Sequence, residues 1–102
     1  MATLHTVNKS PFERSTLVSC LNHTVAGDKI LLIEDGVIGA RKGSAFAELV
    51  KSAQGTCGLY VLAPDMEARG ISEGELVDGV TAVGYNEFVD LVAECERTQS
   101  WL

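Results

Sequence analysis

The sequence predicts an α/β fold, a single domain in which helices cover both faces of a mostly parallel, four-stranded sheet. The chain has 102 residues, which is enough for one hydrophobic core and too few for two. Segments typical of strands alternate with segments typical of helices, which is the order found in parallel sheets. A continuous apolar run within residues 29–34 indicates a strand covered on both faces. We therefore assign residues 1–102 to one three-layer α/β/α sandwich.

Four strands are expected from short apolar or β-branched runs that end at turn residues. They are residues 4–7, 29–34, 59–62 and 80–83. His5 falls inside the first of them and is expected to be a packed, hydrogen-bonded core residue. In such a sheet, ligands and partners meet the loops that follow the carboxyl ends of the strands.

The first helix is expected to begin at Ser10 and to run to about Asn22. Ser10 has the N-cap position, Pro11 follows at the first helical position, and Glu13 completes a capping box. The helix should stop before Gly27, which opens a turn.

Three further helices are expected at residues 44–54, 65–69 and about 85–97. In the last of them Phe88, Leu91, Val92 and Cys95 recur at helical spacing, which predicts a stripe that faces the core. No fifth strand is expected after this helix.

The charge balance excludes two classes of function. Eight basic and 14 acidic side chains give a net charge of −6. Proteins that bind nucleic acid non-specifically or lie on anionic membranes need a basic face, so neither partner is expected. Residues 52–102 hold two basic and nine acidic side chains, a net charge of −7. This acidic half either attracts a basic protein partner or is simply a solvated surface.

The chain is expected to be cytoplasmic. No apolar run approaches the roughly 18 residues of a membrane span, and the first residues lack the basic and apolar regions of a signal peptide. No metal or organic cofactor is expected either, because phosphate-binding glycine motifs and paired cysteines are absent from the sequence. A flavodoxin-like cofactor binder is disfavoured, since the loops lack a Ser/Thr-rich phosphate cradle.

The three cysteines are the candidate nucleophiles, and they are not equivalent. Cys95 lies on the core stripe of the last helix, and Cys57 precedes the third strand at the opposite end from the functional loops; both are interpreted as structural. Cys20 lies at the flank of the Leu17 and Leu21 stripe, where a thiol is expected to be partly exposed.

Two effects on the Cys20 thiol oppose each other. His23 is three residues further along the helix and, when protonated, would favour the thiolate. The position of Cys20 near the C-terminal end of its helix disfavours a thiolate, because the helix dipole is negative there. From the residues alone, a reactive thiol and a half-buried, inert one both remain open.

Five blocks of sequence resemble the DsrH/TusB family, and they follow one another in order over nearly the whole chain. They are LHTVNKSP (4–11), EDGV (34–37), YVL with DMEARGI (60–62 and 65–71), YNEFVDL (85–91) and QSWL (99–102). A thiol at the place of Cys20 is typical of DsrH-type members, whereas some TusB-type members lack it. The chain therefore resembles the DsrH branch.

The resemblance implies a DsrE-like fold and a subunit of a DsrE–DsrF–DsrH heterohexamer with two copies of each chain. Such complexes relay persulfide sulfur in intracellular sulfur oxidation, with the main active cysteine on the DsrE-type partner and a DsrC/TusE-type protein as the onward carrier. Cys20 would then be an accessory sulfur acceptor, which attacks a sulfane sulfur without a metal or cofactor.

Two alternatives to this role stay open. The chain could be a non-catalytic subunit that completes the complex, or it could act as TusB does in forming 2-thiouridine at the tRNA wobble position without binding nucleic acid itself. Trp101, in the terminal block, either packs on its own domain or is covered by a neighbouring subunit.

Overall fold

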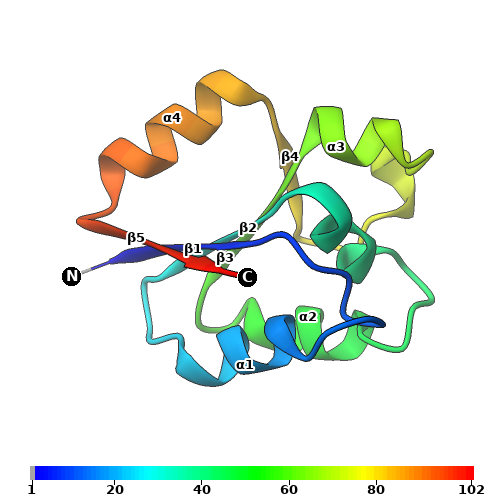
Figure 1. The fold of residues 1–102 in the computed structure, drawn as a ribbon, viewed down its shortest axis with the longest axis horizontal. Helices are drawn as coiled ribbons and strands as arrows, with labels where there is room; N and C mark the ends of the chain where they lie inside the picture. Colours follow the sequence, from blue (N-terminus) through cyan, green and yellow to red (C-terminus); the bar gives the residue numbers. More distant parts are fainter. Residues whose placement is uncertain (1) are drawn as a thin grey trace.

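The sheet has five parallel strands rather than four. The computed structural model describes residues 2–102. The strands are ordered β4-β3-β2-β1-β5 and all pairs are parallel, which confirms the predicted α/β class and sheet direction (Figure 1). Their bounds are β1 Thr3–Val7, β2 Lys29–Leu32, β3 Gly58–Leu62, β4 Thr81–Val83 and β5 Arg97–Trp101.

The helices form the outer layers. In Figure 1, α1 and α2 lie below the sheet, while α4 lies above it. Two short 3₁₀ helices, η1 and η2, stand in the connections. The bounds are α1 Thr16–His23, α2 Ala47–Ala53, α3 Ala63–Ala68, α4 Tyr85–Glu94, η1 Glu34–Ala40 and η2 Glu73–Glu75.

The fifth strand, β5, replaces the expected end of the last helix. α4 stops at Glu94, Cys95 is already extended, and the chain then runs along β1 from Arg97 to Trp101. The sequence of β5, RTQSW, is almost entirely polar because the strand lies at the sheet edge and its first four residues are exposed. Apolar periodicity could not reveal it.

The first helix begins later than expected. α1 starts at Thr16, and residues 11–13 form a turn instead. The Ser10 hydroxyl accepts the Phe12 N–H at 3.2 Å, and the Ser10 carbonyl accepts the N–H groups of Glu13 and Arg14. Pro11 is buried beside η1, which holds this turn against the fold and delays the helix.

The 3₁₀ helix η1 crosses the carboxyl end of β1 at very short range. Ile33, which precedes η1, donates its N–H to the Val7 carbonyl at 3.0 Å. A Cβ added at Gly36 would lie 2.2 Å from that carbonyl oxygen. Only glycine allows this approach, so Gly36 fixes where the chain leaves the sheet.

The core is divided by the sheet into two clusters. The larger one lies between the sheet and α1 and α2, and the smaller one joins α4 to Leu4, Leu31 and Val83. Leu91 and Cys95 face this smaller cluster, as predicted for the stripe of the last helix. The expectation for Val92 was wrong, because this side chain is 42% exposed on the flank of α4.

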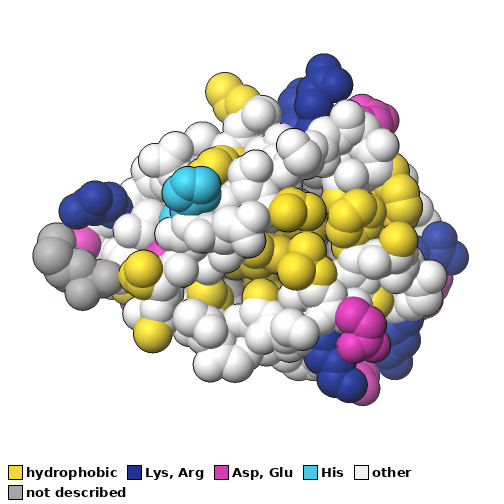
Figure 2. Space-filling model, turned by 90° about the horizontal axis from the view of Figure 1, so that it is seen from below, with side chains coloured by type: hydrophobic (Ala, Val, Ile, Leu, Met, Phe, Trp, Pro, Cys, Tyr) yellow, Lys and Arg dark blue, Asp and Glu magenta, His cyan; other side chains and the backbone are white. Residues whose placement is uncertain are grey.

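An apolar patch remains at the surface over α1 and α2. Figure 2 shows hydrophobic side chains gathered between charged groups of both signs. On this side of the molecule Phe12 is 60% exposed and packs edge-on against Phe46, with ring centroids 5.1 Å apart, and Leu49 is 36% exposed.

Candidate functional site

Cys20 lies in the core and not at the surface. Its exposed fraction is 0%, so the expectation of a partly exposed thiol was wrong. The cause is the orientation of α1 about its own axis. Leu17 and Cys20 both face the sheet, and Leu21 is only partly buried. The thiol therefore has no direct access to solvent.

The surroundings of Cys20 keep the thiol protonated. Burial, with smaller contributions from the nearby Cys57 and Asp28, raises the pKa of Cys20 to about 12. A sulfur nucleophile must be a thiolate, and that form is scarce at neutral pH when the pKa is so high. The surroundings of Cys20 therefore do not activate its thiol as a nucleophile.

His23 does not act as the activating cation that the sequence suggested. Its Nδ1 atom is 2.7 Å from the carbonyl oxygen of Ser19, one turn back along α1. Its ring packs at 5.5 Å from the indole of Trp101. His23 thus joins α1 to β5 rather than supporting a thiolate.

The other two cysteines are buried as well. Cys57 is 4% exposed and Cys95 is 7% exposed, which agrees with their interpretation as structural residues, and all three thiols are free. Burial raises the pKa of Cys95, although the charge of Lys29 partly opposes this effect. Neither residue offers an accessible thiol.

A buried polar network lies close to Cys20, and Asp28 is its centre. The Asp28 carboxylate accepts the N–H groups of Thr3 at 3.0 Å and Val25 at 3.1 Å, and its Oδ2 is 2.9 Å from Nε2 of His5. Burial alone would raise the pKa of Asp28, but the hydrogen bonds from His5, Thr3 and Val25 together hold that pKa below its ordinary value. Asp28 is therefore an anion that needs these donors.

Trp101 completes the network from the sheet edge. Its indole Nε1–H donates to Nδ1 of His5 at 3.0 Å. Because Nδ1 accepts this bond, the His5 proton lies on Nε2 and points to Asp28. His5 is 5% exposed, and the prediction of a hydrogen-bonded core histidine is confirmed. Sequence reasoning did not identify Asp28, which follows the turn at Gly27.

A cleft of about 390 Å³ opens over this network along β1 and β5. Its lining residues are Thr3, His5, His23, Val25, Asp28, Arg97, Gln99 and Trp101. Cys20 does not line the cleft, although the charge of Asp28 reaches its thiol. Both polar and apolar groups line the cleft.

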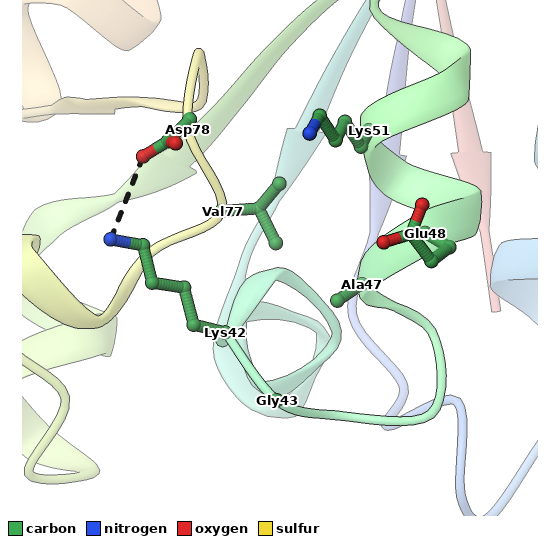
Figure 3. A pocket seen from close by; sticks show the side chains of 7 residues that line it. All are labelled: Lys42, Gly43, Ala47, Glu48, Lys51, Val77 and Asp78. Carbon is green, nitrogen blue, oxygen red and sulfur yellow. Dashed lines mark ion pairs between the residues drawn. The ribbon is translucent and has the colours of Figure 1, made fainter.

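A second hollow, of about 250 Å³, lies between α2 and the segments at residues 42–43 and 77–78 (Figure 3). Lys42 and Asp78 form an ion pair of 3.5 Å at one side of it, while Glu48 and Lys51 project from α2 at the other. None of its seven lining residues is a cysteine or histidine, so it provides no group for sulfur transfer.

The segments that follow β2 and β3 are joined by one ion pair and one hydrogen bond. Arg69 donates to Asp35 at 2.9 Å, and the Asp65 carboxylate accepts the Glu34 N–H at 2.7 Å. These contacts join η1 to α3, and no cysteine lies in either element. Across residues 2–102, no three His, Cys, Asp or Glu side chains group as they would around a metal ion. No helix in this range has the length and apolar character needed to cross a bilayer.

The fold is shared with solved structures of low sequence identity. The ychN protein from E. coli superposes with a TM-score of 0.80 at 17% identity, over 99% of this chain and 100% of that one. Protein Tm0979 from Thermotoga maritima gives a TM-score of 0.67 at 28% identity, over 92% and 93%. The architecture thus defines a class of small, parallel-sheet α/β proteins, here with all three thiols buried.

Sequence comparison identifies the family. The family model described as "DsrH like protein" matches residues 9–98. Protein TusB of Serratia proteamaculans is 40% identical over 98 residues, and that of Erwinia tasmaniensis 41% identical over 98 residues; each alignment covers 96% of this chain and 99% of the relative. The chain belongs to the DsrH/TusB family, as its sequence blocks indicated, and this family has a role in sulfur relay.

Proposed function

We propose that the chain is a non-catalytic subunit of a cytoplasmic sulfurtransferase complex of the TusBCD/DsrEFH type, in which other subunits hold the reactive thiol. The burial of all three cysteines carries this proposal, with Cys20 at 0% exposed and its pKa at about 12. In such a complex the chain supplies surfaces that position DsrE-type and DsrF-type partners, with two copies of each subunit. A DsrC/TusE-type protein would accept the sulfur.

The physiological output that we favour is sulfur supply for 2-thiouridine in tRNA. Relatives that carry the TusB name match this chain at 34–41% identity over 96% of its length. Cys20 pointed to the DsrH branch and to sulfur oxidation because it was expected to be a working thiol. Its burial weakens this argument for sulfur oxidation. A strain that lacks the chain should lose thiolated tRNA and regain it upon complementation; unchanged tRNA thiolation would favour the sulfur-oxidation role.

A second candidate function keeps Cys20 as an accessory sulfur acceptor. It is favoured by one observation, namely that Asp28, which lines the cleft, lies close enough to Cys20 to act on its thiol, so the floor of the cleft is near this cysteine. The Asp28 charge itself opposes the thiolate, so this hypothesis requires that partner binding also lowers the pKa of Cys20. Under this hypothesis the cleft opens when partners bind, and Cys20 attacks a protein persulfide. The Cys20 thiolate then takes the outer sulfur, and the donor cysteine leaves as its thiolate.

The two functions differ in the expected behaviour of a Cys20→Ala variant. If the role is non-catalytic, the reconstituted complex should transfer sulfur within about twofold of the wild-type rate, since Cys20 takes no part in the reaction. Removing the buried sulfur should still lower the free energy of unfolding by about 1–2 kcal/mol, because a small cavity remains. Rates are measured in the complex, and stability by urea unfolding.

Cys57→Ala is the matched control, since this thiol is also buried but is not proposed to accept sulfur. Mass spectrometry of the complex after incubation with a persulfide donor distinguishes the hypotheses directly. An adduct of about 32 Da, the mass of one sulfur atom, on Cys20 together with slowed transfer in Cys20→Ala but not in Cys57→Ala would establish the accessory thiol and overturn the non-catalytic role.

A further inference from the structure

Trp101 and His5 share a hydrogen bond that exists in only one protonation state of the histidine. The Trp101 indole Nε1–H donates to Nδ1 of His5 at 3.0 Å, so Nδ1 carries no proton. The indole nitrogen is a donor only, and both ring nitrogens of a protonated histidine are donors as well. Protonation of His5 would therefore place two N–H groups against each other with no acceptor between them, and this hydrogen bond would be lost.

The other hydrogen bond of His5 survives protonation. Nε2 lies 2.9 Å from Oδ2 of Asp28 and donates to it in the neutral and the charged form alike. The pKa of Asp28 is held below its ordinary value, so above about pH 5 the carboxylate is an anion and attracts the charge of a protonated His5. Asp28 thus favours the charged form of His5, whereas Trp101 favours the neutral form.

The remaining charged and titratable groups around His5 come from the elements that pack against β1. His23 of α1 and Arg97 of β5 line the same cleft and, when charged, oppose a positive charge on His5. The Cys20 thiol of α1 is neutral at any pH near 7, because its pKa is about 12. β2 places the apolar Ile30 beside His5 in the sheet. Among the residues that line the cleft, two cationic groups therefore oppose the charged form of His5 and one carboxylate supports it.

The hydrogen bond to His5 matters for the attachment of β5. This strand lies at the edge of the sheet and pairs with β1 alone, and its first four residues are exposed. Trp101 is the residue of β5 that packs against the larger core cluster. The other side-chain hydrogen bond between the two strands is long, from the Thr6 hydroxyl to the Ser100 hydroxyl at 3.4 Å. Loss of the Trp101–His5 bond would thus loosen the end of β5 and widen the cleft that both side chains line.

We propose that His5 and Trp101 form a pH-sensitive switch that controls the end of β5. At pH 8 the neutral imidazole accepts the indole N–H and β5 is fully attached. When His5 binds a proton under mildly acidic conditions, Trp101 leaves the imidazole and the cleft along β1 and β5 opens, while the rest of the fold is kept. Histidine suits this role because it is the side chain that changes charge between about pH 5 and 8. The inference depends neither on the role of Cys20 nor on the proposed function.

His23 is the matched control, because it packs against the same indole, whose N–H donates to His5 and not to His23. Nδ1 of His23 is 2.7 Å from the Ser19 carbonyl oxygen, which can only accept. Nδ1 therefore carries the proton of neutral His23, and a second proton at Nε2 leaves that bond intact. His23→Gln should keep the pH response of Trp101, and His5→Gln should remove it.

The test is a pH titration of the purified chain from pH 8 to pH 5, followed by NMR of the imidazole nitrogens and of the Trp101 indole N–H. Trp101 is the only tryptophan in the sequence, so its indole signal needs no assignment. At pH 8, His5 should be the tautomer with its proton on Nε2. As His5 takes up a second proton, the protection of the indole N–H from solvent exchange, relative to a free indole, should fall about tenfold with the same midpoint. Circular dichroism verifies that the fold is kept.

A second variant decides the question if His5→Gln does not fold. Trp101→Phe removes the donor that favours neutral His5, so in this variant His5 should bind its proton at a higher pH than in the wild type. Titration of His5 at the same pH in both proteins would show that the indole N–H does not control the histidine, and would overturn the inference.

The remaining outcomes are equally decisive. The switch is wrong if His5 does not titrate between pH 8 and 5, or if it titrates while the indole N–H stays protected. An indole response that disappears in His23→Gln and persists in His5→Gln would assign the response to His23 instead. Loss of the helical circular dichroism signal over the same pH range would show that the whole chain unfolds, and not the end of β5 alone.

Discussion

A chain with Asp28→Ala is expected to be less stable than the wild type by about 3–5 kcal/mol, measured by urea unfolding. Asp28 is 3% exposed and accepts three hydrogen bonds, two from Thr3 and His5 in β1 and one from Val25 in the loop before β2. Alanine leaves those donors buried without an acceptor, and each such loss costs on the order of 1–3 kcal/mol.

The exposed residue Asp78 provides the control for this prediction. Its side chain is 87% exposed and pairs with Lys42 at 3.5 Å, so Asp78→Ala should change stability by no more than about 0.5 kcal/mol. If both variants unfold at the same urea concentration, the Asp28 network does not hold the fold together.

The same network predicts how stability changes with pH. The pKa of Asp28 in the folded chain lies below its ordinary value, so the folded state favours the anion. Its contribution is complete above the unfolded pKa of about 4 and is lost as the pH falls through the lower folded pKa. Asp28→Asn, which cannot titrate, should therefore lose less stability than the wild type in this acidic range. An equally steep loss in both proteins would assign the acid sensitivity to other groups.

Replacing Gly36 with alanine has the second largest expected effect, a loss of about 3 kcal/mol or failure to fold. The new Cβ would lie 2.2 Å from the carbonyl oxygen of Val7, which is backbone and part of the central sheet. Neither β1 nor η1 can move away without breaking the Ile33 to Val7 hydrogen bond. Thermal and urea unfolding measure the loss.

Gly74 in η2 is the matched control, because a Cβ there meets no atom within 4 Å and its backbone is not left-handed. Gly74→Ala should stay within about 0.5 kcal/mol of the wild type. If Gly36→Ala is equally harmless, η1 does not approach β1 as closely as described.

Apolar periodicity was sufficient to predict the buried strands of the sheet but not its edge strand, β5. The runs at 29–34 and 59–62 are buried, and burial leaves a readable apolar pattern. β5 lies at the edge and is polar, so its strand character comes from pairing with β1, which depends on residues more than 90 positions away. Pairing over that distance leaves little trace in the local sequence.

The candidate site was predicted less well for a related reason. The apolar residues of α1, Leu17, Val18, Cys20 and Leu21, cover roughly half of the helix circumference, so the sequence did not specify which part of that arc faces the sheet. Two of the hydrogen bonds to Asp28 likewise come from Thr3 and His5. These residues are more than 20 positions away in the sequence and reach Asp28 only in the folded sheet. The role of His5 as a buried, bonded histidine was predicted correctly, because its strand was recognised.

The order of the strands has a consequence for the way this chain is made. β1 is synthesised before the other four strands and lies between β2 and β5 in the finished sheet, and β5 is the last of the five to be synthesised. One edge of β1 therefore keeps its backbone groups unpaired until translation has passed Trp101. During that interval the nascent sheet has an open edge, and chaperones or a second nascent chain can pair with it before the protein's own last strand arrives.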